Sequence, residues 1–538
     1  GARPTTPPPM PPAGKQPAAR PAGPSIAAFF RAGAQQSAPA PLAPAAPPAP
    51  PAAVLPAPPG RRPQESQAEA AARLIFGHAS LRPKQDEAVR AALAGRDCFV
   101  LLPTGGGKSL CYQLPAVLSA GVTVVVSPLL ALIEDQVGSL VRAPGDENAG
   151  LRGVPATYLS SASAAGHQGQ VFADLCCDPP LTKLLYVTPE MLMHNTRLLQ
   201  LLQQLAARRQ LARLVVDEAH CVSTWGHDFR PEYKELGKLR AQLGKQVPFM
   251  ALTATATTEC QQDIKKLLKL AKDCRCIESS FNRPNLHYSV RRMRMDQKAD
   301  ELIDYVKDWP KGTSGLVYCL SRKETEATCE QLCQAGVPAG CYHAGLSASR
   351  RRAAQQAWQN GEPAVVCATI AMGMGIDKPD VRFVVHHAMS KSIEGYYQES
   401  GRAGRDGQRS ECVVFYAPRD YATLLTFCRG GKGKGRSKGG RGALAKQREA
   451  VQSMKGFCED GGHCRRQQLL EHFGEAVGAG GCGMCDVCDG SLQQRQQATS
   501  AATRKSGAPA AAAAPAQRGG GRGGRGGRGG RGGRGGRG

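Results

Sequence analysis

The chain has 538 residues, 21% of them charged, and a formal net charge of +25 at pH 7. That length predicts two or three domains. No apolar run approaches the roughly 20 residues that a bilayer span requires, so a membrane protein is not expected. The twenty cysteines are scattered through a long chain with no recognisable signal peptide, and we expect most of them to be reduced and buried. Because the sequence begins at Gly1 rather than Met, a lost leader and a longer parent chain stay open.

The positive charge is unevenly distributed along the sequence. Residues 1–65 carry +5, residues 429–448 carry +8 and residues 491–538 carry +10, which leaves only +2 for the rest. An excess of this size favours a polyanionic partner such as nucleic acid. Since the charge lies in segments that are rich in Pro, Gly and Ala, we expect those segments to supply the long-range, salt-sensitive attraction.

Apolar runs predict two consecutive α/β domains, over residues 68–275 and 276–418. In each, short apolar strands alternate with longer mixed segments that suit helices, the pattern of a doubly wound parallel sheet. The expected strands are Cys98–Leu102, Val122–Ser127, Leu184–Val187, Leu214–Val216, Phe249–Thr253, Gly315–Cys319, Ala364–Ala368, Phe383–His386 and Cys412–Tyr416. The expected helices include Ser109–Ala120 and Leu130–Val141.

Three further segments flank these domains. Residues 1–67 are rich in Pro and Ala and are predicted to be disordered, because they cannot bury enough apolar surface to fold. Residues 419–490 suit a small helical subdomain, interrupted by a basic Gly/Lys/Arg insertion at 429–442. Residues 491–538 form a second disordered tail, with Arg-Gly-Gly repeats from Arg518 to Arg537.

A glycine-rich loop follows the first expected strand and leads into a helix. Such a loop lets backbone N–H groups converge on phosphate oxygens at a helix N-terminus. Lys108 is expected to reach the β- and γ-phosphates and Ser109 to bind Mg²⁺. Leu102 stands where the strict pattern has Gly, so the loop is a variant, and the alternative is an ordinary glycine-rich turn. The nucleotide-binding candidates in the loop are Thr104, Gly105, Gly106, Gly107, Lys108 and Ser109.

Two acidic residues, Asp217 and Glu218, come directly after the apolar strand Leu214–Val216. A carboxylate at the carboxyl end of such a strand faces the ligand crevice of a parallel sheet. Asp217 is expected to hold Mg²⁺, and Glu218 to orient or deprotonate an attacking water. The alternative is a solvated surface pair.

A second-domain segment, Gln398–Gly407, contains the arginines Arg402 and Arg405 between glycines. The planar guanidinium fork can bond two phosphate oxygens at once. Arg402, Arg405 and Gln398 are therefore candidate catalytic residues that reach the nucleotide from the second domain. The alternative is a basic surface loop.

The segment Trp225–Tyr233 places aromatic residues beside an arginine, a composition that suits base stacking and equally suits a packed corner. Its DNA-binding candidates are Trp225, His227, Phe229 and Arg230.

Four late cysteines, Cys464, Cys482, Cys485 and Cys488, have the spacing of a tetrahedral zinc site with all four positions filled by thiolates. Such a closed set indicates a structural site. Cys458 and His463 are spare candidates, and a redox pair would not need the third and fourth cysteines.

Together these motifs resemble the RecQ family of DNA helicases over roughly residues 70–490. The resemblance implies two tandem RecA-like domains followed by a zinc subdomain, with ATP, Mg²⁺ and Zn²⁺ as cofactors. Phe76–Gln85 looks like the family's opening motif, in which Gln85 would read adenine and Arg82 would lie against it. The Trp225–Tyr233 loop matches the aromatic-rich loop that couples single-stranded DNA binding to ATP hydrolysis in the family. Further segments similar to family motifs are Val126–Leu129, Asp135–Gln136, Tyr186–Glu190, Ala251–Thr257, Tyr342–Leu346 and Ala368–Lys378.

The activity that the resemblance implies is 3′→5′ translocation on single-stranded DNA and unwinding of tailed or forked duplexes, in DNA repair, recombination or replication. Nuclear location fits that activity, although an organelle stays open. Two rivals are an RNA helicase of the Asp-Glu-Ala-His type and a non-enzymatic strand-annealing protein. The Trp225 loop and the cysteine set argue against the first, and an intact Lys108, Asp217, Glu218 and Arg405 set argues against the second.

The chain also departs from the family pattern. Only low-complexity sequence follows Cys488, so it resembles the short forms that lack the winged-helix and terminal helical domains, and the usual strand-separating hairpin is expected to be absent. The Arg-Gly-Gly tail suits RNA or DNA contacts, or mere solubility. In the N-terminal tail, Ile26, Phe29 and Phe30 resemble a motif that docks on the sliding clamp of replication, except that Gly23 stands where Gln is expected.

Overall fold

The computed structural model describes residues 65–143, 153–223, 226, 229–372, 378–428, 441–476, 478 and 480–497. Four sets of sequence predictions lie outside these residues. They are the N-terminal motif with Ile26, Phe29 and Phe30, the loop residues Trp225 and His227, residues 373–377 of the Ala368–Lys378 segment, and the basic segments 429–440 and 498–538. Over the described part of the chain, every helix is too short or too polar to cross a membrane.

The first domain is built on a seven-stranded sheet whose strands all run parallel, in the order β3-β4-β2-β5-β6-β1-β7. The central strand β2 has the sequence Val-Thr-Val-Val-Val and is buried at every position. A run of β-branched residues suits a strand that is covered on both faces. The strands are β1 (Cys98–Leu101), β2 (Val122–Val126), β3 (Ala156–Leu159), β4 (Leu184–Val187), β5 (Leu211–Val216), β6 (Phe249–Thr253) and β7 (Arg275–Glu278).

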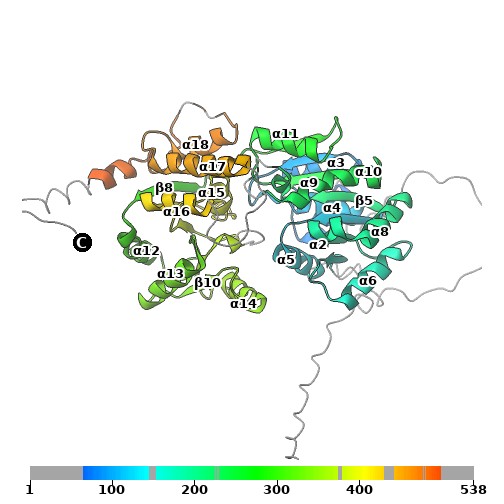
Figure 1. Ribbon diagram of the computed structural model, residues 1–538, viewed down its shortest axis with the longest axis horizontal. Coiled ribbons are helices and arrows are strands. Elements are labelled where there is room, and N and C mark those ends of the chain that lie inside the picture. Colours follow the sequence, from blue (N-terminus) through cyan, green and yellow to red (C-terminus); the bar gives the residue numbers. More distant parts are fainter. Residues whose placement is uncertain are drawn as a thin grey trace, which may run out of the picture.

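Helices cover both faces of this sheet (Figure 1). One apolar cluster joins one face to α2 (Gln67–Phe76), α3 (Pro83–Leu93), α4 (Leu110–Leu118) and α5 (Leu130–Val141). Another joins the opposite face to α6 (Ala165–Cys176), α7 (Pro189–His194), α8 (Thr196–Ala207), α9 (Pro231–Glu235), α10 (Leu239–Leu243) and α11 (Thr258–Leu267). Local signals fix several helix starts; Ser66, for example, forms a capping box with Glu69 at the start of α2.

The second domain repeats the plan with a six-stranded parallel sheet, in the order β10-β11-β9-β12-β13-β8. Its strands are β8 (Leu286–Arg292), β9 (Gly315–Tyr318), β10 (Ala339–Tyr342), β11 (Val365–Ala368), β12 (Phe383–His386) and β13 (Ser410–Tyr416). The helices α12 (Lys298–Lys307) and α13 (Arg322–Gln334) pack on one face. The other face is joined to α14 (Ala348–Gln359), α15 (Ile393–Ser400) and α16 (Pro418–Cys428). The prediction of two tandem α/β domains is confirmed.

The nine expected strands are all present, with small differences at their ends. Leu214–Val216, for instance, is the second half of β5. The sequence patterns missed four strands, β3, β7, β8 and β10, each of which lies at or next to a sheet edge or carries polar residues.

The helical region after the second sheet joins both domains. It contains α17 (Arg441–Glu459), α18 (Arg465–His472) and the cysteine-rich turn that follows. That turn pairs with β8, since Tyr288 donates its N–H to the carbonyl of Met484 (3.3 Å) and accepts from the N–H of Asp486 (3.0 Å). Leu470 and Phe473 belong to the apolar core of the first domain. We call residues 441–497 the zinc module; it lies above α15 and α16 in Figure 1.

Candidate nucleotide cleft and zinc site

The phosphate loop runs from the end of β1 to the start of α4. Gly105 and Gly107 adopt φ values of +80° and +77°, which side chains rarely tolerate. A Cβ atom on Gly107 would collide with the Gln85 side chain, and one on Gly106 would lie 2.8 Å from the carbonyl oxygen of Pro103. The three glycines are therefore required by the shape of the loop, as in a loop whose backbone N–H groups cradle phosphate.

Helix α3 supports this loop through the two residues assigned to the opening motif. The Gln85 amide donates to the carbonyl of Gly107 (3.2 Å), and Arg82 donates to the carbonyl of Gly105 (2.7 Å). The backbone N–H of Arg82 in turn donates to the Gln85 side-chain oxygen (2.9 Å), which fixes the orientation of the Gln85 amide. Arg82 and Gln85 thus lie against the phosphate loop, and adenine recognition by them stays a prediction.

Lys108 and the acidic pair lie close together at the carboxyl ends of β1 and β5. Burial lowers the pKa of Lys108, and the nearby carboxylates of Glu218 and Asp217 oppose that shift. Burial, reinforced by Glu218, raises the pKa of Asp217 well above its usual range. Glu218 is one of the few non-glycine residues with positive φ (+48°), and its N–H donates to the Asp217 carboxylate (3.0 Å). Two crowded, desolvated carboxylates beside an ammonium group are typical of a functional site.

Neighbouring residues tie the acidic pair to other parts of the first domain. His220 contacts the Thr253 hydroxyl at the end of β6 (3.0 Å) and the Glu218 carboxylate (3.3 Å). The buried Tyr233 hydroxyl donates to the Asp217 carbonyl (3.2 Å). The sequence marked Tyr233 only as the end of the aromatic loop, because its contact with Asp217 depends on how that loop folds back.

Of the predicted DNA-binding residues, Phe229 and Arg230 lie within the described part. Phe229 is exposed, with 37% of its surface accessible. The Arg230 guanidinium donates to the carbonyl of Pro128 (2.7 Å), in the Val126–Leu129 segment. The C-terminal part of the loop is therefore attached to the Val126–Leu129 segment through Arg230 and to the acidic pair through Tyr233.

The second domain brings its arginine segment against the phosphate loop. A Cβ atom on Gly105 would lie 3.4 Å from Cγ of Arg405, and one on Gly401 would lie 3.2 Å from Cβ of Thr104. The charge of Arg405 also acts to lower the pKa of Lys108. Arg402 is buried, and Gln398 is half-buried on α15. The predicted arginine segment thus meets the phosphate loop across the domain boundary, with both Gly401 and Arg405 beside it.

A further interdomain residue, Arg283, was missed by the sequence analysis. It lies between β7 and β8 and donates to the carbonyls of Thr104 (3.0 Å) and Gly401 (3.3 Å). The only signal in the sequence is the polar Asn-Arg-Pro-Asn stretch at 282–285, which is typical of any loop.

The four predicted cysteines come together in the zinc module. The sulfur atoms of Cys464, Cys482, Cys485 and Cys488 all lie within 4.8 Å of one another, a spacing that suits one tetrahedral Zn²⁺ with Zn–S bonds of about 2.3 Å. Although burial acts to raise it, hydrogen bonds from backbone and neighbouring thiols lower the pKa of Cys464 to about 7. His463 is exposed and contacts Asp460 instead.

Comparison with known protein families divides the chain into three matches. Residues 82–264 match the DEAD/DEAH box helicase family, residues 297–407 match the helicase conserved C-terminal domain, and residues 418–489 match the RecQ zinc-binding family. The last match agrees with the four-cysteine geometry, so zinc binding by this module is confirmed.

The sequence identity between this chain and its curated relatives is much higher than its identity to similar solved structures. The chain is 45% identical over 401 residues to the RecQ-like DNA helicase BLM of Xenopus laevis, which covers 74% of this chain and 28% of that protein. It is 40% identical over 412 residues to the ATP-dependent DNA helicase Q1 of Rattus norvegicus, which covers 76% and 62%. The chain thus spans less than two thirds of these relatives.

Among solved structures, the helicase MrfA bound to DNA and AMPPNP aligns with a TM-score of 0.54 at 18% identity, covering 67% of this chain and 52% of that one. The DEAD-box helicase Mss116 bound to single-stranded RNA aligns with a TM-score of 0.52 at 14% identity, covering 72% and 80%. At these identities the alignments establish the tandem-domain fold alone.

Proposed function

Because the chain belongs to the RecQ family of helicases, we propose that it is an ATP-dependent DNA helicase that translocates 3′→5′ on single-stranded DNA and unwinds tailed or forked duplexes. The roles that we propose for it are in DNA repair, recombination or replication, in the nucleus. The observation that carries the proposal is the meeting of the phosphate loop, the acidic pair and the Arg405 segment at the boundary between the two domains, which we call the nucleotide cleft.

Each residue of the cleft has a role that follows from its chemistry. Lys108 binds the β- and γ-phosphates as a point charge, and the loop N–H groups hold the same phosphates. Glu218 orients or deprotonates the attacking water. Arg405, with Arg402 behind it, meets the charge that develops on the transferred phosphoryl group. Since these groups come from two domains, ATP draws the domains together and hydrolysis releases them.

The donor set at Ser109 and Asp217 suits a magnesium ion. Hydroxyl and carboxylate oxygens are the ligands that Mg²⁺ prefers. Burial, and then the neighbouring Glu218, raise the pKa of Asp217, so a cation bound there would favour its ionised form. A bound Mg²⁺ would neutralise charge on the phosphates. The charges of Lys108 and His220 act to lower the pKa of Asp217, but they offset burial and the repulsion from Glu218 only in part.

The aromatic loop is the proposed link between DNA and hydrolysis. Phe229 is exposed and available for stacking on a base. The same loop reaches Asp217 through the Tyr233 hydroxyl and the Val126–Leu129 segment through Arg230. A base that displaces the loop would therefore shift the residues that position water and metal.

Two finer partner proposals rest on sequence alone. Docking on the sliding clamp would use Ile26, Phe29 and Phe30, and RNA contacts would use the Arg-Gly-Gly tail. A peptide of residues 20–34 that fails to bind the clamp would end the first proposal.

The test of the proposed function is unwinding of three labelled substrates, each with and without ATP: 3′-tailed DNA, 5′-tailed DNA and 3′-tailed RNA. We expect opening of the 3′-tailed DNA only, in the presence of ATP and Mg²⁺, and loss of that opening in Lys108→Ala. Opening of the RNA would favour the RNA-helicase rival. Strand exchange that needs no ATP and survives Lys108→Ala would favour the annealing rival.

A further inference from the structure

We propose that the interdomain segment Asn282–Asn285 is a coupling strap that joins the nucleotide cleft to the zinc module, with Arg283 as its positioning residue. The inference rests on the proposed function and adds to it how the arginine segment is delivered to ATP. Arg283 would not touch the reacting atoms; it would set the position of the groups that do.

The two terminal nitrogens of Arg283 donate four hydrogen bonds, which reach the phosphate loop and the arginine segment. One terminal nitrogen donates to the carbonyls of Thr104 (3.0 Å) and Gly401 (3.3 Å). The other donates to the carbonyls of Ala403 (3.0 Å) and Gly404 (2.8 Å). A single rigid guanidinium group therefore holds the phosphate loop of one domain and the arginine segment of the other at a fixed separation.

The same guanidinium lies beside the nucleotide-binding glycines. A Cβ atom on Gly105 would lie 3.9 Å from the Arg283 nitrogen and 3.4 Å from Cγ of Arg405. If the phosphate loop moves when phosphate binds or leaves, both the Arg283 and the Arg405 side chains must therefore move with it.

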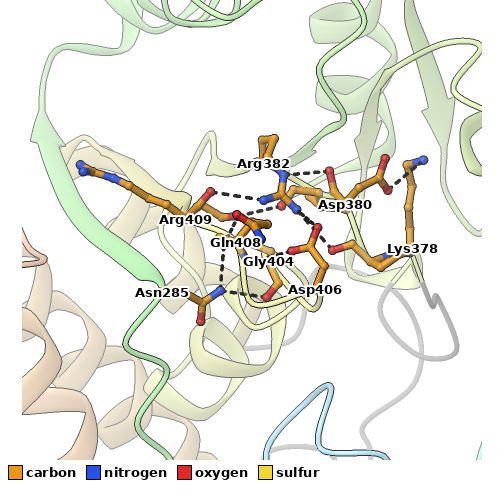
Figure 2. Close-up of polar contacts among 12 residues, drawn as sticks. Asn285, Lys378, Asp380, Arg382, Gly404, Asp406, Gln408 and Arg409 are labelled. Atoms are coloured by element: carbon orange, nitrogen blue, oxygen red, sulfur yellow. Dashed lines mark hydrogen bonds and ion pairs between the residues drawn. The ribbon is translucent and has the colours of Figure 1, made fainter. Parts of the chain in front are cut away.

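Asn285, two residues further along, holds the same arginine segment from its other end (Figure 2). Its amide donates to the carbonyls of Gly404 and Gln408, both at 2.9 Å. Gly404 has φ of +54°, and a Cβ atom there would lie 2.5 Å from that amide, so the contact leaves no room for a side chain. The segment is also held within the second domain, where Arg382 pairs with Asp406 (2.6 Å).

The far side of the strap is held by the zinc module. Arg466, buried on α18, donates to the Asn282 side chain (2.8 Å), to the Arg283 carbonyl and to the Leu286 carbonyl (2.6 Å). Arg466 lies two residues after the zinc ligand Cys464, which is the N-cap of α18. The backbone of Arg283 is therefore fixed by the zinc module while its side chain holds the cleft.

Contacts just before the strap tie the zinc module to the first domain as well. Phe281 stacks on Phe473, with ring centroids 4.4 Å apart, and its N–H donates to the Glu475 carboxylate (2.7 Å). The strap thus begins and ends on the zinc module. The zinc module would therefore take part in the ATP cycle by fixing the backbone position from which Arg283 contacts the two loops.

The inference predicts that substitution of Arg283 lowers the catalytic rate while nucleotide affinity stays nearly unchanged. Lys108, Gln85 and the loop glycines, which would bind ATP, all belong to the first domain, whereas Arg283 controls how the second domain meets them. We expect Arg283→Gln to lower the kcat of DNA-stimulated ATP hydrolysis at least tenfold, with less than a threefold change in KM for ATP or in the affinity for a fluorescent ADP analogue. Arg283→Lys keeps the charge but lacks the fork, so it should restore only a small part of kcat.

Arg382→Gln is the matched control. Arg382 also donates to backbone carbonyls, those of Pro379, Asp380 and Arg409, and it holds the same arginine segment through Asp406. These four partners all lie within the second domain. Arg382→Gln therefore weakens the contacts that hold the arginine segment within the second domain but keeps the Arg283 contacts to the first domain. We expect its kcat to fall less than that of Arg283→Gln. Arg466→Gln should reproduce the Arg283→Gln kinetics in weaker form, and the double variant should be little worse than Arg283→Gln alone.

The experiment measures all variants in the full chain, with melting temperature and zinc content recorded for each. Wild-type protein without DNA-stimulated ATP hydrolysis would refute the proposed function itself. With an active wild type, equal falls in kcat for Arg283→Gln and Arg382→Gln would overturn the strap. So would unchanged kcat in Arg283→Gln, or a loss of nucleotide affinity that matches the loss of kcat in both Arg283 variants.

Discussion

A buried ion pair far from the cleft offers a quantitative test of how the second domain is held together. Lys298 on α12 and Asp420 on α16 have only 1% and 2% of their surfaces exposed. The Lys298 ammonium group uses all three donors, on the two carboxylate oxygens of Asp420 (3.1 and 2.8 Å) and on the His387 carbonyl (2.7 Å). The substitution Lys298→Met keeps most of the side-chain volume and removes the charge.

The expected cost follows from what remains after the substitution. Asp420 would stay buried without a cation, although it would keep the N–H groups of Ala417 (3.1 Å) and Met389 (3.4 Å) as donors. Removing one partner of a buried pair typically costs about 3–5 kcal/mol, whereas replacing both partners is often close to neutral. Because two donors remain, we expect Lys298→Met to lower the free energy of unfolding of the second domain by about 3 kcal/mol, and Lys298→Met/Asp420→Asn to recover at least about half of that.

Urea unfolding followed by tryptophan fluorescence can measure this. Two of the three tryptophans, Trp309 and Trp358, lie in the second domain, so the signal reports mainly on that domain. A loss below about 1 kcal/mol in Lys298→Met, or a double variant as unstable as the single one, would refute the reasoning that an unpaired buried charge dominates the cost.

Three further outcomes are expected. Cys485→Ser should abolish stoichiometric zinc binding and lower the melting temperature, as measured by metal analysis and calorimetry; full zinc content would contradict the four-cysteine site. Gly107→Ala, which forces a side chain to φ of +77° and into Gln85, should weaken nucleotide binding at least about tenfold in a fluorescent-ADP titration. Burial acts to raise the pKa of Glu394, but His472 on α18 lowers it to about 2. Glu394 therefore stabilises the fold above its unfolded pKa near 4.5, and this contribution fades as pH falls from about 4.5 to about 2, so Glu394→Gln should flatten the loss of melting temperature over that range.

The sequence predicted the central strands of both sheets better than it predicted the edge strands. Each expected strand consists mainly of consecutive apolar residues, which marks a strand covered on both faces. The missed strand β7, with sequence Arg-Cys-Ile-Glu, lies at a sheet edge and buries only Ile277. Strand β8 is also an edge strand, and its sequence Leu-His-Tyr-Ser-Val-Arg-Arg hides its apolar positions among polar ones.

The candidate residues that the sequence did identify share a local signal. Lys108 and Asp217 each follow a strand at a characteristic spacing, and the four cysteines are spaced as ligands. Arg283 has no such signal, because its four acceptors are backbone carbonyls from two distant segments that meet only when both domains have folded. Residues that act through backbone contacts across domains are therefore the ones that sequence patterns miss.

The position of the zinc module bears on what zinc does for this protein. Cys485 is fully buried and pairs with Tyr288 of β8, which makes the zinc turn an extension of the second sheet. Phe473, which directly follows α18 in the same module, lies in the core of the first domain. A structural zinc site usually stabilises the small fold that encloses it. Here the enclosed helix α18 contacts both domains and the segment between them, so loss of zinc would release the pivot of the interdomain segment as well as the module's own turn. Zinc removal should therefore lower kcat for ATP hydrolysis before it lowers nucleotide affinity, the same order of effects that is expected for Arg466→Gln.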